Sequence, residues 1–183
     1  STYGDARIKK IETDRIQNEL AQHRIVIFTG FQGINKWDDT TTLGRGGSDT
    51  SAVALAAALK ADKCQIYTDV DGVYTADPNK VPTAKKIDAI TYDEMLELAT
   101  LGAKVLHNRS VEMAKRYHVN LEVLSSFTGH PGTIVQEVVK QMEKSHVSGV
   151  AKDKDVARLA LVALENRPGV AFKVFSLLAN AKI

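Results

Sequence analysis

The sequence predicts an α/β fold in which helices lie on both sides of a mostly parallel sheet. A β-branched run at residues 25–28 stops at Thr29 and Gly30, and a glycine-rich loop follows. A second β-rich run at residues 66–68 also ends at a polar pair, and helical patterns lie between the two runs. Strands that alternate with helices and end in polar loops are typical of parallel sheets, whose ligands bind at the carboxyl ends of the strands.

The other elements follow from periodicity and from start and stop signals. Residues 91–94 have the spacing of a capping box, and the apolar, alanine-rich pattern after residue 51 predicts a buried helix. Helices are predicted over residues 12–22, 51–60, 91–100, 107–117 and 170–180. Further strands are predicted over residues 121–124, 132–135 and 156–164.

The composition is that of an ordinary globular protein, with 44% hydrophobic and 25% charged residues. A net charge of +2 gives no indication of a nucleic-acid or membrane partner. Cys64 is the single cysteine, so we expect no internal disulfide, a reducing compartment and a buried, inert thiol at a strand start. No apolar run reaches the eighteen residues of a membrane span.

Residues 40–51 combine three glycines with hydroxyl side chains, one arginine and one aspartate, directly before an apolar helix. Glycines allow backbone N–H groups to approach an anion, and the helix adds the positive end of its dipole. Arg45 can bind a carboxylate with two hydrogen bonds, and Asp49 can bind an ammonium group. The alternative is a loop that only caps the helix, with Ser48 or Asp49 as the N-cap residue.

Four strings together carry a resemblance to a known family. They are TTLGRGGSDTSA at residues 41–52, YTDVDGVYTADP at 67–78, FTGFQG at 28–33 and LGAKVLH at 101–107. These strings resemble the aspartate kinases of the amino-acid-kinase superfamily, and the resemblance covers nearly all of the chain. It implies the amino-acid-kinase (carbamate-kinase-like) fold, with residues 1–143 as the C-terminal part of the catalytic domain.

The resemblance implies an enzyme that transfers the γ-phosphoryl group of ATP, with Mg²⁺, to the β-carboxylate of L-aspartate. The product would be 4-phospho-L-aspartate, in the first step of lysine, threonine and methionine biosynthesis in the cytoplasm. Because a carboxylate is already ionised at pH 7, the step needs no general base, and catalysis relies on alignment and on cations. The family also implies a homodimer under feedback control.

The resemblance also implies roles for individual residues. Those on the side of the aspartate substrate would be Phe31, Arg45, Ser48 and Asp49. Those on the nucleotide side would be Thr68, Asp69, Tyr74, Asp77 and Lys104. Ordinary core packing stays open for Phe31. The family often has Arg after the Asp-Pro pair, whereas this chain has Asn79, so one contact is absent or Lys80 replaces it.

No catalytic residue is assigned with certainty. The family's Lys-Phe-Gly-Gly-Thr-Ser loop, whose lysine stabilises the transferring phosphoryl group, is not in this sequence. We therefore expect residues 1–183 alone not to support normal turnover. The histidines, His107 included, have no metal-ligand spacing and are expected at the surface or in packing, and no protein metal site is predicted.

The C-terminal part looks like the opening of an ACT domain, a module that binds amino-acid effectors. Residues 143–155 are interpreted as a linker or a surface strand pair, and residues 144–183 as linker plus the first strand and helix of a truncated ACT domain. Asn166, Arg167, Pro168 and Gly169 would then lie near a site for lysine or threonine. The plainer interpretation is a Pro-Gly turn that starts a helix.

Two rival functions remain. One is another kinase of the superfamily, for uridylate, glutamate or acetylglutamate, against which the ACT-like tail and the full GRGGSDTSA string argue. The other is a non-catalytic amino-acid-binding regulatory module. The absent lysine loop favours this second rival, whereas Arg45, Asp69 and Lys104 favour an active protein. The sequence leaves the inhibiting amino acid and the assembly open.

Overall fold

The computed structural model describes residues 3–139, 147–153, 156 and 167–181. The chain divides into two units, Ser1–Asp153 and Lys154–Ile183. The predicted domain boundary, between residues 143 and 144, lies outside the described residues. None of the helices in the described ranges has the length and apolar character that crossing a bilayer requires.

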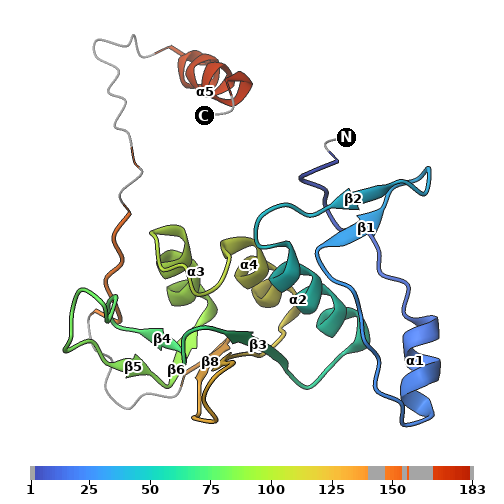
Figure 1. The fold of residues 1–183 in the computed structure, drawn as a ribbon. Helices are drawn as coiled ribbons and strands as arrows, with labels where there is room; N and C mark the ends of the chain where they lie inside the picture. The colour runs from blue at the N-terminus through green and yellow to red at the C-terminus, as the bar shows by residue number, and fades with distance from the viewer. Residues whose placement is uncertain (1–2, 140–146, 154–155, 157–166, 182–183) are drawn as a thin grey trace. The chain divides into compact units, whose positions relative to one another are not determined.

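A four-stranded sheet forms the centre of the first unit (Figure 1). Its strands are, in spatial order, β3 (Cys64–Thr68), β7 (Leu121–Ser125), β8 (Thr133–Gln136) and β6 (Ala89–Thr91). β3 pairs with β7 and β6 pairs with β8 in parallel, whereas β7 and β8 are antiparallel. The predicted class, an α/β fold with a mostly parallel sheet, is therefore confirmed.

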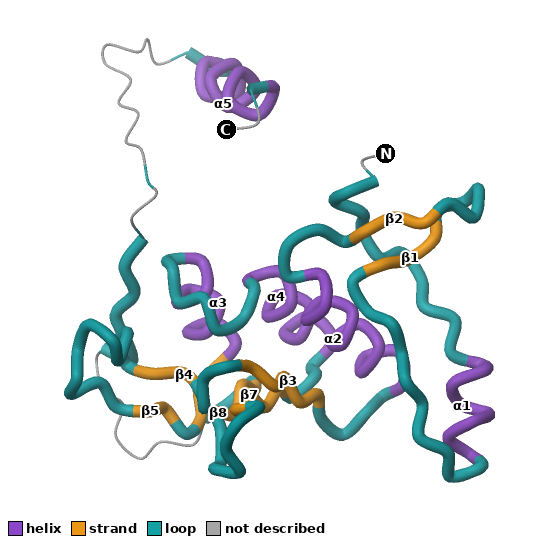
Figure 2. The backbone as a smooth tube through the Cα atoms, viewed as in Figure 1, coloured by secondary structure: helices purple, strands orange, loops and turns teal. Residues whose placement is uncertain are grey.

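Three helices cover one face of this sheet: α2 (Gly47–Leu59), α3 (Tyr92–Thr100) and α4 (Asn108–Tyr117) (Figures 1 and 2). Alternate strand residues point toward the helices, as the two-residue period of a strand requires. The core includes Val53, Ile90, Met95, Val111, Val123 and Val135. On the other face Tyr67 and Ile134 are exposed, so the described helices cover one face where the sequence predicted two.

Two short antiparallel pairs lie outside the main sheet. They are β1 (Gln32–Ile34) with β2 (Thr40–Thr42), and β4 (Val73–Tyr74) with β5 (Lys86–Ile87). The second pair is tied to the main sheet by the buried hydroxyl of Thr133. This hydroxyl accepts a hydrogen bond from the Val73 N–H (2.8 Å) and donates one to the Ile87 carbonyl (2.6 Å).

The predicted helix starts are largely confirmed. Thr91 and Glu94 form a complete capping box at the start of α3, and His107 is the N-cap residue of α4. α1 (Asp14–Ala21) lies within the predicted helix 12–22.

Two expectations are wrong. Residues 25–28 are extended but belong to no sheet, and the side chains of Ile25 and Ile27 are 95% and 93% exposed. A β-branched sequence forms a strand only where a neighbouring edge pairs with it. α2 begins at Gly47 rather than at residue 51, and its N-cap is Gly46 in the left-handed conformation (φ 72°) rather than Ser48 or Asp49.

Residues 147–153, which the sequence assigned to a linker or a surface strand pair, belong to the first unit. The Ser148 hydroxyl donates to the Glu94 carboxylate (2.6 Å), and the Val150 N–H donates to the Thr75 carbonyl (2.8 Å). In the second unit, α5 (Val170–Asn180) starts after Gly169, close to the predicted position. Nearly all of the predicted strand 156–164, and Asn166, lie outside the described residues.

Replacing Thr91 with Ala removes the hydroxyl that accepts the Glu94 N–H (3.3 Å) and donates to the Glu94 carboxylate (2.7 Å), whereas the backbone N–H of residue 91 still donates to that carboxylate. We expect the free energy of unfolding in urea to fall by about 1 kcal/mol. Thr100→Ala, at the exposed last residue of the same helix, serves as the control and should stay within about 0.5 kcal/mol of the unsubstituted chain. Equal losses in the two variants would contradict the capping role.

Burial raises the pKa of the Cys64 thiol to about 11. At pH 8 such a thiol is about 0.1% ionised, and only the thiolate is alkylated. We expect iodoacetamide to react with the folded chain about 100-fold more slowly than with the chain in urea, and the rate to rise with pH. Rapid labelling of the folded chain at pH 8 would show that Cys64 is neither buried nor neutral.

Candidate functional site

A glycine-rich loop, residues 43–47, joins β2 to α2 and has an alternating left-handed backbone. Gly44 and Gly46 have φ values of 76° and 72°, and the Gly47 N–H donates to the Gly44 carbonyl (3.0 Å). Leu43 is buried at one end of the loop, whereas Arg45 is exposed between the two left-handed glycines. The loop therefore holds its middle residue out toward solvent.

Space requires glycine at two positions, Gly46, which is also left-handed, and Gly47. A Cβ atom on Gly46 would lie 2.5 Å from Cβ and 2.6 Å from Cδ2 of His107. A Cβ atom on Gly47 would lie 2.9 Å from the side chains of Leu43 and Phe31. These distances are shorter than a carbon–carbon contact permits, so only glycine fits either position.

Phe31, which the sequence places on the aspartate side, lies against this loop. Its N–H donates to the Ser51 hydroxyl (2.9 Å), and its carbonyl accepts from the Leu43 N–H (2.8 Å). Its φ is 70°, which is uncommon for a bulky residue, and 43% of its surface is exposed. The contact with Gly47 is packing, and the exposed part of the ring leaves room for a ligand contact as well.

Arg45, Ser48 and Asp49 lie close together because they span the loop and the first turn of α2. Among the described residues Arg45 has no hydrogen-bond or ion-pair partner, so its cation is available to an anion. Partial burial raises the pKa of the Asp49 carboxyl, while hydrogen bonding from the His107 backbone and the charge of that imidazole lower it.

A hollow of about 350 Å³ lies beside Arg45 and the N-terminus of α4. Its lining includes the guanidinium groups of Arg7, Arg45 and Arg109 and the carboxylates of Asp5 and Glu112. A lining with an excess of cations and a minority of anions suits a small molecule that carries both carboxylate and ammonium groups.

Arg109 is a residue of this region that the sequence reasoning missed. Its guanidinium donates to the carbonyls of Leu43 and Ala6, both at 2.8 Å, and lies 3.9 Å from the Asp5 carboxylate. Burial and the nearby Arg7 lower the pKa of Arg109. Arg109 lies two residues beyond the string LGAKVLH, and no local pattern marks it, because its partners are 66 and 103 residues away.

Four of the five residues predicted on the nucleotide side lie at or after the carboxyl end of β3: Thr68, Asp69, Tyr74 and Asp77. The Thr68 hydroxyl donates to the Asp69 carboxylate (3.1 Å), and the Thr68 carbonyl accepts from the Ser126 N–H (2.7 Å). Since β3 and β7 are parallel, both of their carboxyl ends lie at this edge of the sheet. Such an edge is the usual ligand site of a parallel sheet.

Tyr74 and Asp77 each have a local partner. The Tyr74 hydroxyl donates to the Asp71 carboxylate (2.8 Å), and this bond raises the pKa of Tyr74. Asp77 forms an ion pair with Lys80, which lowers the pKa of the Asp77 carboxyl. Lys80 is thus already paired within the turn.

Lys104 is exposed on the loop between α3 and α4, without a hydrogen-bond or ion-pair partner in the described part of the chain. No hydrogen bond or ion pair among the described residues joins the aspartate-side and nucleotide-side residues to each other. In the same ranges, no group of three or more His, Cys, Asp or Glu side chains could hold a metal ion.

Arg167, Pro168 and Gly169 are exposed immediately before α5 in the second unit, and Gly169 has a φ of 90°. The turn therefore starts a helix, as the plainer interpretation required. That this turn lies near a site for an amino-acid effector stays a prediction.

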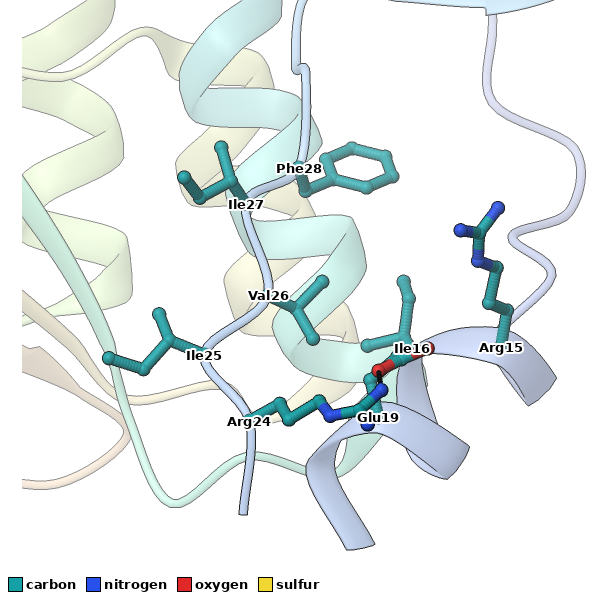
Figure 3. Close-up of a pocket in the computed structure, with 8 residues that line it drawn as sticks. All are labelled: Arg15, Ile16, Glu19, Arg24, Ile25, Val26, Ile27 and Phe28. Carbon is teal, nitrogen blue, oxygen red and sulfur yellow. Dashed lines mark hydrogen bonds and ion pairs between the residues drawn. The ribbon is translucent and has the colours of Figure 1, made fainter. Parts of the chain in front are cut away.

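A larger hollow of about 530 Å³ contains none of the predicted site residues. It lies between α1 and residues 24–28 (Figure 3). An ion pair between Arg24 and Glu19 (2.7 Å) crosses it, and the unpaired residues 25–28 supply its apolar side. Its apolar lining reflects an extended segment without a neighbouring strand.

Comparison with known proteins gives one family match and several close relatives. Residues 2–125 match the amino acid kinase family. An aspartokinase of Thermus thermophilus is 52% identical over 181 residues, which are 99% of this chain and 44% of that protein. The chain thus spans less than half the length of that relative.

Two solved structures share the fold at substantial identity. The crystal structure of E. coli aspartokinase III in complex with aspartate and ADP is 42% identical, with a TM-score of 0.65 over 70% of this chain and 29% of that one. The complex of E. coli aspartokinase III with lysine and aspartate is 34% identical, with a TM-score of 0.65 over 92% of this chain and 38% of that one.

The family match covers more than half of the chain, and the glycine-rich loop and the edge of the parallel strands lie within it. The chain belongs to the amino acid kinase family.

Proposed function

We propose that the protein carrying this chain phosphorylates the β-carboxylate of L-aspartate with MgATP to give 4-phospho-L-aspartate. The observation that carries the proposal is 52% identity to an aspartokinase across 99% of the chain. The E. coli relative that was solved with aspartate and ADP supports both the acceptor and the nucleotide.

The chemistry places one main demand on the site. An aspartate carboxylate is ionised at pH 7, so it can attack the γ-phosphorus without a base, but two anions must approach each other. Cations must therefore offset the repulsion and align the reactants. The exposed, unpaired Arg45 and Lys104 suit this task, whereas a nucleophile–base pair is not needed.

On the aspartate side, we assign Arg45 to a substrate carboxylate through its two-pronged hydrogen bonds. Asp49 and Ser48, in the first turn of α2, would bind the ammonium group and a carboxylate, respectively. Phe31 would close the pocket with the exposed part of its ring. The mixed charges of the adjacent hollow agree with a substrate that carries two carboxylates and one ammonium group.

On the nucleotide side, we assign Thr68, Asp69, Tyr74 and Asp77, with Lys104 binding the phosphates. Tyr74 would lie against the base or ribose. Mg²⁺ is commonly bound by substrate phosphates with one or two carboxylates, so we propose that it enters as a complex with the ATP phosphates.

We further propose that the protein acts in the cytoplasm at the start of lysine, threonine and methionine biosynthesis, as a homodimer under feedback control. The T-state complex of the E. coli relative with lysine supports an amino-acid effector, lysine or threonine. The effector would bind near residues 166–169, in an ACT domain that begins after residue 143.

Trapping the product with hydroxylamine tests the reaction. Purified protein carrying this chain is incubated with MgATP and aspartate, glutamate or uridylate, and both ADP and hydroxamate are measured. We expect hydroxamate with aspartate alone, because hydroxylamine reacts with an acyl phosphate. ADP release with uridylate and no hydroxamate would favour the rival kinase. No product with any acceptor would favour the non-catalytic binding module.

Arg45→Lys keeps the positive charge but loses the two-pronged hydrogen bond. We expect the KM for aspartate to rise about tenfold or more, while the KM for MgATP stays within about twofold. Arg116→Lys, on the exposed side of α4, is the matched control and should change neither value. A rise in the KM for MgATP alone would move Arg45 to the nucleotide side.

A further inference from the structure

Two side chains at the N-terminus of α4 contact the glycine-rich loop, and they contact its two ends. Arg109 contacts the start of the loop, where its guanidinium donates to the Leu43 carbonyl at 2.8 Å. The same guanidinium donates to the Ala6 carbonyl at 2.8 Å, so two donors of one planar group are fixed at once. The Arg109 side chain is only 11% exposed, which strengthens these hydrogen bonds.

His107 contacts the other end of the loop. Its side chain occupies the space that a Cβ atom on Gly46 would need, so the loop backbone lies directly against the imidazole. The ring Nδ1 accepts the Arg109 N–H (3.3 Å), which also donates to the side-chain oxygen of Asn108 (2.7 Å). The His107 carbonyl in turn accepts from the Ser110 hydroxyl (2.7 Å) and the Ser110 N–H (3.0 Å).

The two contacts lie on either side of Arg45. Since Leu43 is fixed by Arg109 and Gly46 by His107, the backbone of the exposed Arg45 has little freedom between them. α4 itself is firmly placed, because Val111 and Ala114 are fully buried against the core and α4 packs beside α2 (Figure 1). A rigid helix therefore sets the position of a surface loop.

We infer that His107 and Arg109 are positioning residues, which hold the glycine-rich loop so that Arg45 meets the acceptor carboxylate in a fixed orientation. This inference rests on the proposed function, since it assigns Arg45 to the acceptor. It adds two residues at the edge of the hollow whose proposed role is exerted through the loop. Alignment matters here because the reaction has no covalent step that the protein could assist.

The alternative is that His107 and Arg109 only stabilise the fold. Two variants separate the possibilities. His107→Asn keeps an N-cap residue for α4, because Asn is among the best N-caps, but it removes the imidazole surface beneath Gly46. Arg109→Lys keeps the positive charge but cannot donate to both carbonyls from a planar group. His118→Asn and Arg116→Lys, exposed at the other end of α4, are the matched controls.

Two measurements are made on the protein carrying this chain. Hydrogen–deuterium exchange of the amides of residues 43–47 reports loop order without any substrate. We expect exchange to become about tenfold faster in His107→Asn and Arg109→Lys, with no change in the controls. Steady-state kinetics should give an aspartate KM about tenfold higher, with the KM for MgATP within about twofold.

Unchanged loop exchange in both variants would overturn the inference. An equal rise of both KM values with a lower thermal midpoint would also overturn it, since that pattern indicates general destabilisation. If the unsubstituted protein makes no product from aspartate, the proposed function fails, and the exchange measurement alone then decides whether α4 positions the loop.

Discussion

The absence of side chains at Gly46 and Gly47 allows three distant segments to meet at the start of α2. Phe31 reaches Gly47 from before the β1–β2 hairpin, and His107 reaches Gly46 from the N-terminus of α4. A Cβ atom at either position would push one of these segments away, because it would lie 2.9 Å or less from the side chain of Phe31 or His107, which is closer than carbon atoms can approach. The positions of Arg45 and Asp49 depend on this close approach, since they lie beside and after the two glycines.

Among the described residues, two of the predicted site cations, Arg45 and Lys104, have no hydrogen-bond or ion-pair partner, whereas other cations are paired. Arg109 is committed to two carbonyls and lies near Asp5, and Lys80 is paired with Asp77. Arg45 and Lys104 remain exposed, which has little structural benefit because a solvated cation without a partner adds no stabilising contact. Such residues are explained by a ligand more readily than by the fold, and a phosphoryl donor and a carboxylate acceptor both need cations.

The parts of the fold that local patterns determine were predictable. The capping box at Thr91, the buried strand start at Cys64 and the helices α1 and α3 to α5 follow from signals within a few residues. Residues 25–28 were predicted wrongly because strand formation depends on a neighbouring edge, which a local pattern cannot supply. The start of α2 was misplaced because Gly46, in the left-handed conformation, stands where a side-chain cap was expected, and its close contact with His107, 61 residues later in the chain, leaves no local pattern.

Local patterns also revealed some residues of the site and not others, because they do not show contacts between distant parts of the chain. Residue types and family strings pointed to Arg45, Asp49 and Lys104, because unusual chemistry in a glycine-rich loop can be seen in the sequence. Arg109 could not be found in this way, since an arginine that binds backbone carbonyls leaves no pattern at its partners Leu43 and Ala6.

Contacts such as those of Arg109 are important because the proposed reaction transfers a phosphoryl group to a carboxylate that is already ionised. With no proton to move and no covalent intermediate to form, the rate depends on how accurately the charged groups are held. In a flexible loop, Arg45 would have to reorient as charge moves from one reactant to the other. This reorganisation would reduce its electrostatic stabilisation of the transition state. The contacts of α4 with the loop order it when the chain folds. The free-energy cost of ordering the loop is therefore met before either substrate binds.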